Sequence, residues 1–330
     1  GDIDCVALRH VDDVWIGANT HADAERALSR YREAIREFEL DINETKTRIS
    51  SEDFAFSDFW PSELSQEIEF AIRTEGRKGR ERLRFALEHA FALTAREHDD
   101  GILKYMLRSI DLYGLSLTHW ADVEPFLKRS AVHFGHTVDY VARILVWRHL
   151  RNGDLDIAAW QPILHSILEK HARLGNDSEV CWTIYAIHML NAPIQIEDAR
   201  RIVENCGALS IVGVLNCVAL GLVDEDIFAT ARARLDVETA SGRYWPVFLE
   251  WVSRSWPGHG ELDPRNDVIV RLAAEHVTVY DPERVPLVFR DVDQDHFNQV
   301  ARAIERRSSM YDDADEGEEF HPDIDVEELF

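Results

Sequence analysis

Hydrophobic residues follow two different patterns along the chain, and the change comes near residue 55. In the first part, two short apolar runs, residues 5–8 and 14–16, lie on either side of the polar pair Asp12 and Asp13. Strand-favouring residues around a polar turn predict a β-hairpin with the two aspartates at its tip.

A helix is predicted directly after this hairpin. Apolar residues recur at three- and four-residue spacing over 21–39, the pattern of an amphipathic helix, and Thr20 precedes it as an N-cap. Further apolar residues over 40–49 predict a return to extended structure around a polar segment.

The rest of the chain has helical periodicity almost to residue 308. Three candidate helix pairs are separated by polar or glycine breaks: 121–134 with 137–150, 157–174 with 178–190, and 196–206 with 208–220. The pairs begin 36 and 39 residues apart. Such a period predicts an α-solenoid, because one pair cannot bury both of its apolar faces. An irregular helical domain is the alternative, and in either case the expected fold class is α+β, mostly α.

Acidic residues outnumber basic ones by 61 to 36, giving a formal net charge of −25, but the charge is uneven. Residues 311–330 hold ten acidic side chains and no Lys or Arg, which predicts a solvated acidic tail from about residue 309. A docking peptide or a mimic of nucleic acid are the alternatives. The sign of the charge reverses in a basic segment, residues 73–84. This segment contains two glutamates and six cations: Arg73, Arg77, Lys78, Arg80, Arg82 and Arg84.

Composition excludes several classes of protein. With 45% hydrophobic residues, nine Trp and fifteen Phe, the chain can bury a core, so disorder of the whole is excluded. The longest apolar stretch, 208–222, is shorter than the about 20 residues that a membrane span needs and is interrupted by Asn216. Four cysteines without CxxC spacing favour a reducing cytoplasm.

The strongest chemical signal is the pair Asp12 and Asp13. Carboxylates that hold two divalent ions can support transfer of a nucleotide to a 3′-hydroxyl, and a tight hairpin presents such ligands rigidly. An Asp-Asp turn is also common without any such role. About thirty residues later, however, comes the segment 40–47, Leu-Asp-Ile-Asn-Glu-Thr-Lys-Thr.

Together these segments resemble the last two palm motifs of reverse transcriptases, the xxDD hairpin and the "GLxLNxxKT" element, with a helix between them. The matching residues are 9–17, Arg-His-Val-Asp-Asp-Val-Trp-Ile-Gly, followed by Leu40, Ile42, Asn43, Lys46 and Thr47. His10 replaces the usual Tyr or Phe, and Glu39 replaces the Gly before Leu40.

The resemblance implies a role for each matching residue. Asp12 and Asp13 would bind Mg²⁺ or Mn²⁺, with Asp12 the more important ligand. Lys46 would lie near the triphosphate of an incoming deoxynucleotide and protonate the departing pyrophosphate, although it could equally be a surface lysine. The family also needs a first-motif Asp and fingers. We therefore expect residues 1–330 to be the C-terminal part of a longer polymerase and to be inactive alone.

The long helical remainder makes the chain similar to bacterial defence reverse transcriptases of the abortive-infection type, which carry a C-terminal, HEAT-like helical-repeat domain. The resemblance implies four regions: 1–55, the end of the palm; 56–120, a thumb-like helical region; 121–308, the repeat domain; and 309–330, the acidic tail. Expected partners are a DNA or RNA primer-template, deoxynucleotide triphosphates, the upstream fingers and palm, and further copies in a homo-oligomer.

Within the helical part, two features bear on nucleic acid. The basic segment would touch the primer-template backbone, unless it is only a solvated helix face. Arg143, Arg148 and Arg151 are expected near one helical face as a second local cluster, and the aromatic stretch 244–251 is either core or a stacking platform. The competing hypothesis for the whole chain is a non-catalytic helical scaffold with a degenerate palm remnant that binds a protein trigger.

Overall fold

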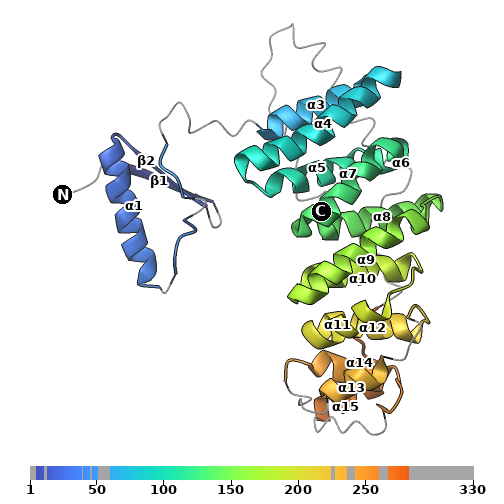
Figure 1. Cartoon of the computed structure of the whole chain (residues 1–330). Coiled ribbons are helices and arrows are strands. Elements are labelled where there is room, and N and C mark those ends of the chain that lie inside the picture. Colours follow the sequence, from blue (N-terminus) through green and yellow to red (C-terminus); the bar gives the residue numbers. More distant parts are fainter. Residues whose placement is uncertain are drawn as a thin grey trace. The chain divides into compact units, whose positions relative to one another are not determined.

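The computed structural model describes residues 5–10, 13–38, 40–44, 47–50, 60–223, 227–235, 242–259 and 267–281. Contacts divide the chain into two units, Gly1–Glu63 and Leu64–Phe330. Most of the described residues are helical, and the described part holds one two-stranded antiparallel sheet (Figure 1). The expected class, α+β and mostly α, is therefore confirmed.

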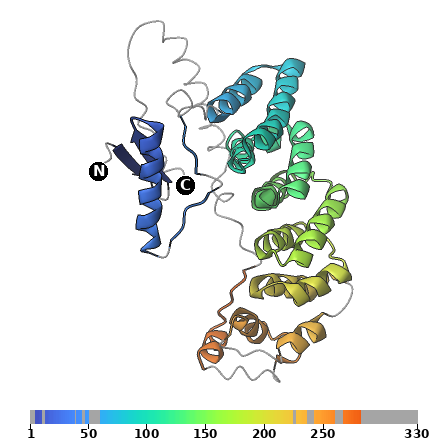
Figure 2. The ribbon, with the colours of Figure 1, turned by 60° about the vertical axis from the view of Figure 1, so that its left-hand side comes forward.

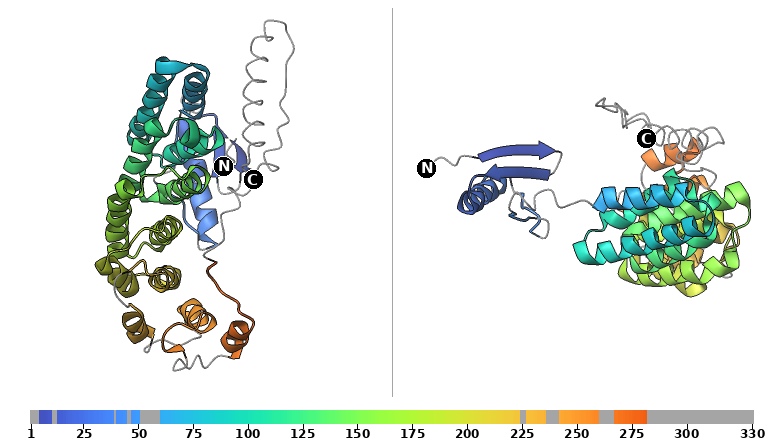
Figure 3. Two further views of the ribbon diagram at one scale, coloured as in Figure 1. Left: turned by 90° about the vertical axis from the view of Figure 1, so that its right-hand side faces the viewer. Right: turned by 90° about the horizontal axis from the view of Figure 1, so that it is seen from above.

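The first unit begins with the predicted hairpin and helix. Strand β1 (Cys5–His10) pairs with β2 (Asp13–Ala18) in a register that places His10 opposite Asp13. Helix α1 (His21–Arg36) follows directly and packs against both strands (Figure 3). The Thr20 side chain accepts a hydrogen bond from the Asp23 amide at 3.1 Å, which is the N-cap that the sequence predicts.

One face of the hairpin is apolar and exposed within this unit. Cross-strand partners share a face, so Leu8 and Trp15 lie together with Val6 beside them. Their exposed fractions are 66%, 55% and 77%. Val14 and Ile16 alternate with these residues and are half-buried.

The segment after α1 differs from the expectation. Residues 40–44 and 47–50 form no strand. Instead, the Thr47 amide and hydroxyl both donate to the Asn43 carbonyl, at 3.0 and 2.9 Å, and the Asp41 carboxylate accepts from the Ile42 amide at 2.9 Å. Such local bonds compete with sheet pairing, which explains why the predicted extended segment turns here.

The second unit is a series of helices. They are α3 (Trp60–Arg73), which begins just before the division, α4 (Gly76–Glu97), α5 (Gly101–Leu112), α6 (Leu115–Thr118), α7 (Trp120–His133), the 3₁₀ turn η1 (Gly135–Thr137), α8 (Val138–Asn152), α9 (Ile157–Leu174), α10 (Asp177–Met189), α11 (Ile196–Asn205), α12 (Ala208–Ala219), α13 (Phe228–Leu235), α14 (Trp245–Ser253) and α15 (Asp267–Ala274).

These helices stack in two rows (Figure 2). Helices α4, α7, α9, α11 and α13 pack one after another in the first row, and α5, α8, α10, α12 and α14 in the second. Successive helices from the two rows form hairpins, such as α9 with α10. The three predicted helix pairs are confirmed to within a few residues as α7–α8, α9–α10 and α11–α12. None of the described helices is long and apolar enough to cross a membrane.

Polar contacts at helix ends join neighbouring helical hairpins. Asp177, at the start of α10, accepts hydrogen bonds from the Gly207 amide at 2.7 Å and the Ser210 hydroxyl at 2.6 Å. A Cβ atom at Gly207 would lie 2.6 Å from the Asp177 carboxylate. Glycine therefore permits this carboxylate to cap the first turn of α12.

A second close approach positions the basic segment. Gly79 in α4 is buried, and a Cβ atom there would lie 1.8 Å from the Thr74 carbonyl oxygen. The start of α4 can therefore pass the end of α3 only with glycine at this position. This contact fixes where the cations of the two helices lie relative to each other.

Candidate functional sites

The hairpin end is the first candidate site. Asp13 begins β2 opposite His10, so the backbone leaves two residues, Val11 and Asp12, between the paired ends. Asp12 and Lys46 lie outside the described residues, as do the side chains of His10 and Asp13. Among the residues that the structure describes, no group of three or more His, Cys, Asp or Glu side chains is arranged to hold a metal ion.

The segment that carries Lys46 is tied to α1. The Arg32 guanidinium donates to the Glu44 carboxylate at 2.6 Å. Beyond the lysine, the Thr47 amide donates to the Asn43 carbonyl at 3.0 Å. Glu44, two residues before the lysine, thus ties this segment to the helix that packs on the hairpin.

The basic segment is the second candidate site, on the last turn of α3 and the first half of α4. Three of its arginines form ion pairs: Arg73 with Glu69 at 3.4 Å, Arg77 with Glu81 at 2.7 Å, and Arg84 with the buried Asp122 at 2.5 Å. The Arg82 guanidinium lies 3.9 Å from the centre of the Phe70 ring.

Two cations of this segment remain available for a ligand. Lys78 and Arg80 are exposed and form no ion pair with any described residue. The Arg77–Glu81 pair is also exposed, and exposed pairs contribute only about 0–1 kcal/mol. A phosphate could therefore replace Glu81 as the partner of Arg77 at little cost.

Replacing Arg77, Lys78 and Arg80 by Ala should weaken nucleic-acid binding without sequence selectivity. Each lost phosphate contact reduces the magnitude of the slope of log affinity against log salt concentration by about 0.7 to 0.9. The slope of the triple variant should therefore be smaller in magnitude by up to about 2 to 3. Titrations at several salt concentrations would measure it. A control removes the same charge from other exposed positions, Arg96, Arg173 and Arg271. An equal slope in both triple variants would contradict the assignment.

The expected cluster of Arg143, Arg148 and Arg151 is not a single surface. Arg148 is buried, bonds to the Ser116 carbonyl and lies 2.6 Å from Asp154. Five helical positions separate Arg143 from Arg148, which rotates the two side chains about 140° apart. Arg148 is therefore a structural residue, and the prediction of one shared face is wrong.

Three of the four aromatic residues in the stretch 244–251 belong to the core, whereas Trp245 is 43% exposed. Tyr244, Phe248 and Trp251 are 1%, 3% and 0% exposed. The Trp251 indole nitrogen donates to the Pro257 carbonyl at 3.0 Å, and its ring meets those of Phe228 and Trp256. These rings are not open to stacked bases.

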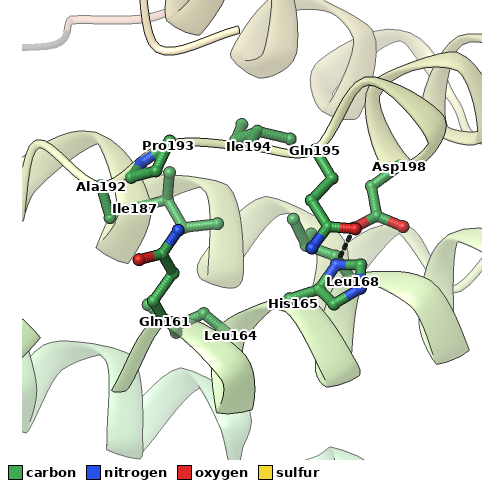
Figure 4. A pocket seen from close by; sticks show the side chains of 10 residues that line it. All are labelled: Gln161, Leu164, His165, Leu168, Ile187, Ala192, Pro193, Ile194, Gln195 and Asp198. Carbon is green, nitrogen blue, oxygen red and sulfur yellow. Dashed lines mark hydrogen bonds and ion pairs between the residues drawn. The ribbon is translucent and has the colours of Figure 1, made fainter. Parts of the chain in front are cut away.

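A small pocket between α9 and α11 holds a polar group that the sequence does not reveal (Figure 4). The Asp198 carboxylate is fully buried; His165 Nδ1 bonds to one oxygen, and Arg201 donates to the other at 3.0 Å. Burial raises the pKa of Asp198, while His165 and Arg201 oppose that shift. The only signal in the sequence is the three-residue spacing of Asp198 and Arg201 on one helix.

This pocket has the composition of a structural site. None of its ten lining residues carries a hydroxyl, a thiol or an amine that could act as a nucleophile: Gln161, Leu164, His165, Leu168, Ile187, Ala192, Pro193, Ile194, Gln195 and Asp198. His165 connects neighbouring hairpins through Asp198.

Three histidines should make the stability of the helical unit depend on pH. Burial lowers the pKa of His136, His171 and His188 below the usual 6.5, and Arg254 lowers that of His188 further. The unfolded chain then binds more protons than the folded one below pH 6.5. The contribution to the free energy of unfolding is complete above about pH 6.5 and is lost as the pH falls through the lowered pKa values.

Urea unfolding at pH 7.5 and 5.5 would test this pH dependence. The midpoint should fall at pH 5.5, and the fall should be smaller in His171→Gln, because His171 is 3% exposed. Replacement of the exposed His276 by Gln is the control and should leave the difference unchanged. A midpoint that does not change with pH would contradict the assignment.

No protein-family model, curated protein or solved structure matches the chain. The resemblance to reverse transcriptases therefore depends on the residues of the hairpin and of the segment 40–47.

Proposed function

We propose that the chain is part of a reverse transcriptase-like DNA polymerase of bacterial antiphage defence, which transfers nucleotides to a 3′-hydroxyl or a protein primer. One observation carries the proposal. Strand β1 ends at His10, β2 begins at Asp13, and α1 follows and packs on both strands. Strand, strand and helix occur in the order that the matched palm motifs require.

The exposed face of the hairpin supports the same proposal. A sheet of two strands is marginally stable alone, so Val6, Leu8 and Trp15 need a covering layer. In the proposed polymerase, the upstream part of the palm would provide one. We therefore infer that the rest of a polymerase palm packs against these three side chains.

Asp12 and Asp13 fit a site for Mg²⁺ or Mn²⁺. Carboxylate oxygens are the ligands that these hard cations prefer, and the two consecutive aspartates supply two carboxyl groups. When bound, the ions would activate the attacking oxygen and neutralise the leaving pyrophosphate. Asp12 and Asp13 would hold them, together with a first-motif Asp outside residues 1–330.

Other residues of the chain would bind and position the substrates. Lys46 would approach the triphosphate and donate a proton to the pyrophosphate. In a thumb-like role, Lys78 and Arg80 would contact the primer-template backbone. The stack from α7 onward would act as the HEAT-like repeat domain that guides nucleic acid and supports assembly.

A direct test is nucleotide incorporation by the complete polymerase, with residues 1–330 joined to fingers and a first-motif segment. We expect Mg²⁺-dependent incorporation of labelled deoxynucleotides that stops on addition of EDTA. The chain of 330 residues alone should incorporate none. Absence of incorporation by the complete protein, with every primer and template supplied, would contradict the proposal.

A non-catalytic scaffold is the second candidate, favoured by exposed apolar side chains on the stack. Leu174 and Leu209 are 64% and 58% exposed. Exposed leucines on stacked helices suit protein partners, including a second copy of the chain. Light scattering of the whole chain, before and after replacement of both leucines by Ser, would detect self-association. Self-association in a complete protein that incorporates no nucleotide would favour the scaffold.

A further inference from the structure

We propose that a row of alternating arginine and aromatic side chains on α5, α8 and α10 binds single-stranded nucleic acid. This Arg–aromatic row consists of Arg108, Tyr140, Arg143, Trp182 and Tyr185. It is separate from the basic segment and from the hairpin. Its binding does not require the polymerase activity proposed for the chain.

The row is continuous across three successive helices. Arg108 on α5 donates from Nε to the Tyr140 hydroxyl on α8 at 2.9 Å. The Arg143 guanidinium lies 4.5 Å from the centre of the Tyr140 ring and 5.5 Å from that of Trp182 on α10. The rings of Trp182 and Tyr185 are 5.8 Å apart and nearly perpendicular.

The row differs from the aromatic core in its exposure to solvent. Arg108 is exposed, and the other four residues are half-buried. In contrast, Trp251 in α14 and Trp160 in α9 are fully buried. Aromatic rings that only joined the helices would be most stable when buried. Tyr140 and Trp182 instead keep part of their surface open to a base.

Arg143 in this row can exchange its carboxylate partner for a phosphate. Arg143 pairs with Asp139 one turn earlier at 3.3 Å, and the two side chains are 22% and 30% exposed. Phosphate bonds an arginine more strongly than a long contact of this kind, so it can replace Asp139.

Tyr185 adds an uncharged ring beside Arg143. Its hydroxyl is buried and has no hydrogen-bond partner among the described residues. Burial raises the pKa of Tyr185 to about 12, while Arg143 opposes the shift, so the hydroxyl stays protonated at neutral pH. Tyr185 therefore adds an aromatic ring without a negative charge beside Arg143, which suits an anionic ligand.

The chemistry of the row favours a single strand over other anionic partners. Bases stack on aromatic rings and on guanidinium groups whatever their sequence, and phosphates pair with the same arginines. An acidic peptide would use the arginines but not the rings. A duplex keeps its bases stacked inside and would use neither ring. Helices in contact lie about 8–10 Å apart, so three of them give a row about 20 Å long, enough for several nucleotides.

Binding of a fluorescent 20-nucleotide oligothymidylate to the full chain, without metal or nucleotide, tests the proposal. Trp182→Leu should weaken binding about tenfold or more, since loss of one stacking ring costs about that much. Arg143→Gln should weaken it similarly and lower the salt slope by about 0.7. The matched control is Arg129→Gln: Arg129 lies 4.1 Å from the Phe91 ring centre and pairs with Glu88, outside the row.

Three outcomes would overturn the proposal. Equal losses in Arg143→Gln and Arg129→Gln would show non-specific attraction. A loss in Arg143→Gln but not in Trp182→Leu would indicate an anionic partner such as an acidic peptide. Trp182→Phe retains a ring and should bind within about threefold of the original chain, which separates stacking from a folding defect. Failure of the unaltered chain to bind the oligonucleotide would also refute it.

Discussion

Replacing Asp12 by Asn in the complete polymerase should reduce nucleotide incorporation at least about 100-fold while leaving the fold intact. Loss of an outer hydrogen-bond partner of a metal ligand already costs about 10- to 100-fold, and loss of a charged ligand itself should cost more. The fold should tolerate the change because Asn has nearly the same shape as Asp and is equally suited to a turn. Incorporation of labelled deoxynucleotides, together with a thermal unfolding curve, would measure both effects.

A second carboxylate of the same unit provides the control. Asp41 is exposed and bonds only locally among the described residues, to the Ile42 amide, so Asp41→Asn should retain activity. Asp13→Asn should be milder than Asp12→Asn. Full activity in Asp12→Asn, or equal losses in the Asp12 and Asp41 variants, would exclude the proposed metal site.

Local patterns predicted most of the architecture. The hairpin and α1 could be predicted because alternation, helical spacing and the Thr20 cap lie within about twenty residues of sequence. The three helix pairs could be predicted for the same reason, since glycine and polar breaks separate their apolar runs. Their arrangement in two rows follows from the need to bury a second face of each hairpin.

Features that depend on tertiary contacts could not be predicted. The partner of Arg84 is Asp122, 38 residues further along, so the sequence could not show that this cation is already paired. Similarly, 33 residues separate His165 from Asp198. Local hydrogen bonds around Asn43 compete with strand pairing, and residues 40–44 and 47–50 form no strand.

The Arg–aromatic row shows the same limit at a functional surface. Arg143 was predicted to matter together with Arg148 and Arg151, because all three lie in one helix. The structure instead places Arg143 between Tyr140 of its own helix and Trp182 of the next helix in the row. Only the packing of α8 on α10 brings these side chains together.

Replacing Glu250 by Ala should lower the free energy of unfolding of the helical unit by about 3–5 kcal/mol. Glu250 in α14 is fully buried; one carboxylate oxygen accepts from Arg254, and the other accepts from the Val279 amide at 2.8 Å. Arg254 in turn donates to the Tyr280 carbonyl. Removal of one partner leaves a charge and an amide without their acceptor, the costly case for a buried pair.

The same change should release the segment 277–281 from the stack. Tyr280 also bonds through its hydroxyl to His188 on α10 at 2.7 Å, so Glu250 and His188 hold this segment from two helices. Faster amide hydrogen exchange at Val279 in Glu250→Ala would detect the release, and urea unfolding would give the loss of stability. In Glu250→Gln, which keeps one acceptor, both effects should be smaller.

An exposed pair with the same spacing provides the matched control. Glu169 and Arg173 on α9 are also four residues apart, at 2.9 Å, but are 43% and 65% exposed. Glu169→Ala should therefore cost no more than about 1 kcal/mol, because water replaces the lost carboxylate. Equal losses of stability in the Glu169 and Glu250 variants would contradict the importance of burial for the Glu250–Arg254 pair. The segment 277–281 would then be held by Tyr280 and by Ser253, whose hydroxyl donates to the Val277 carbonyl at 2.8 Å.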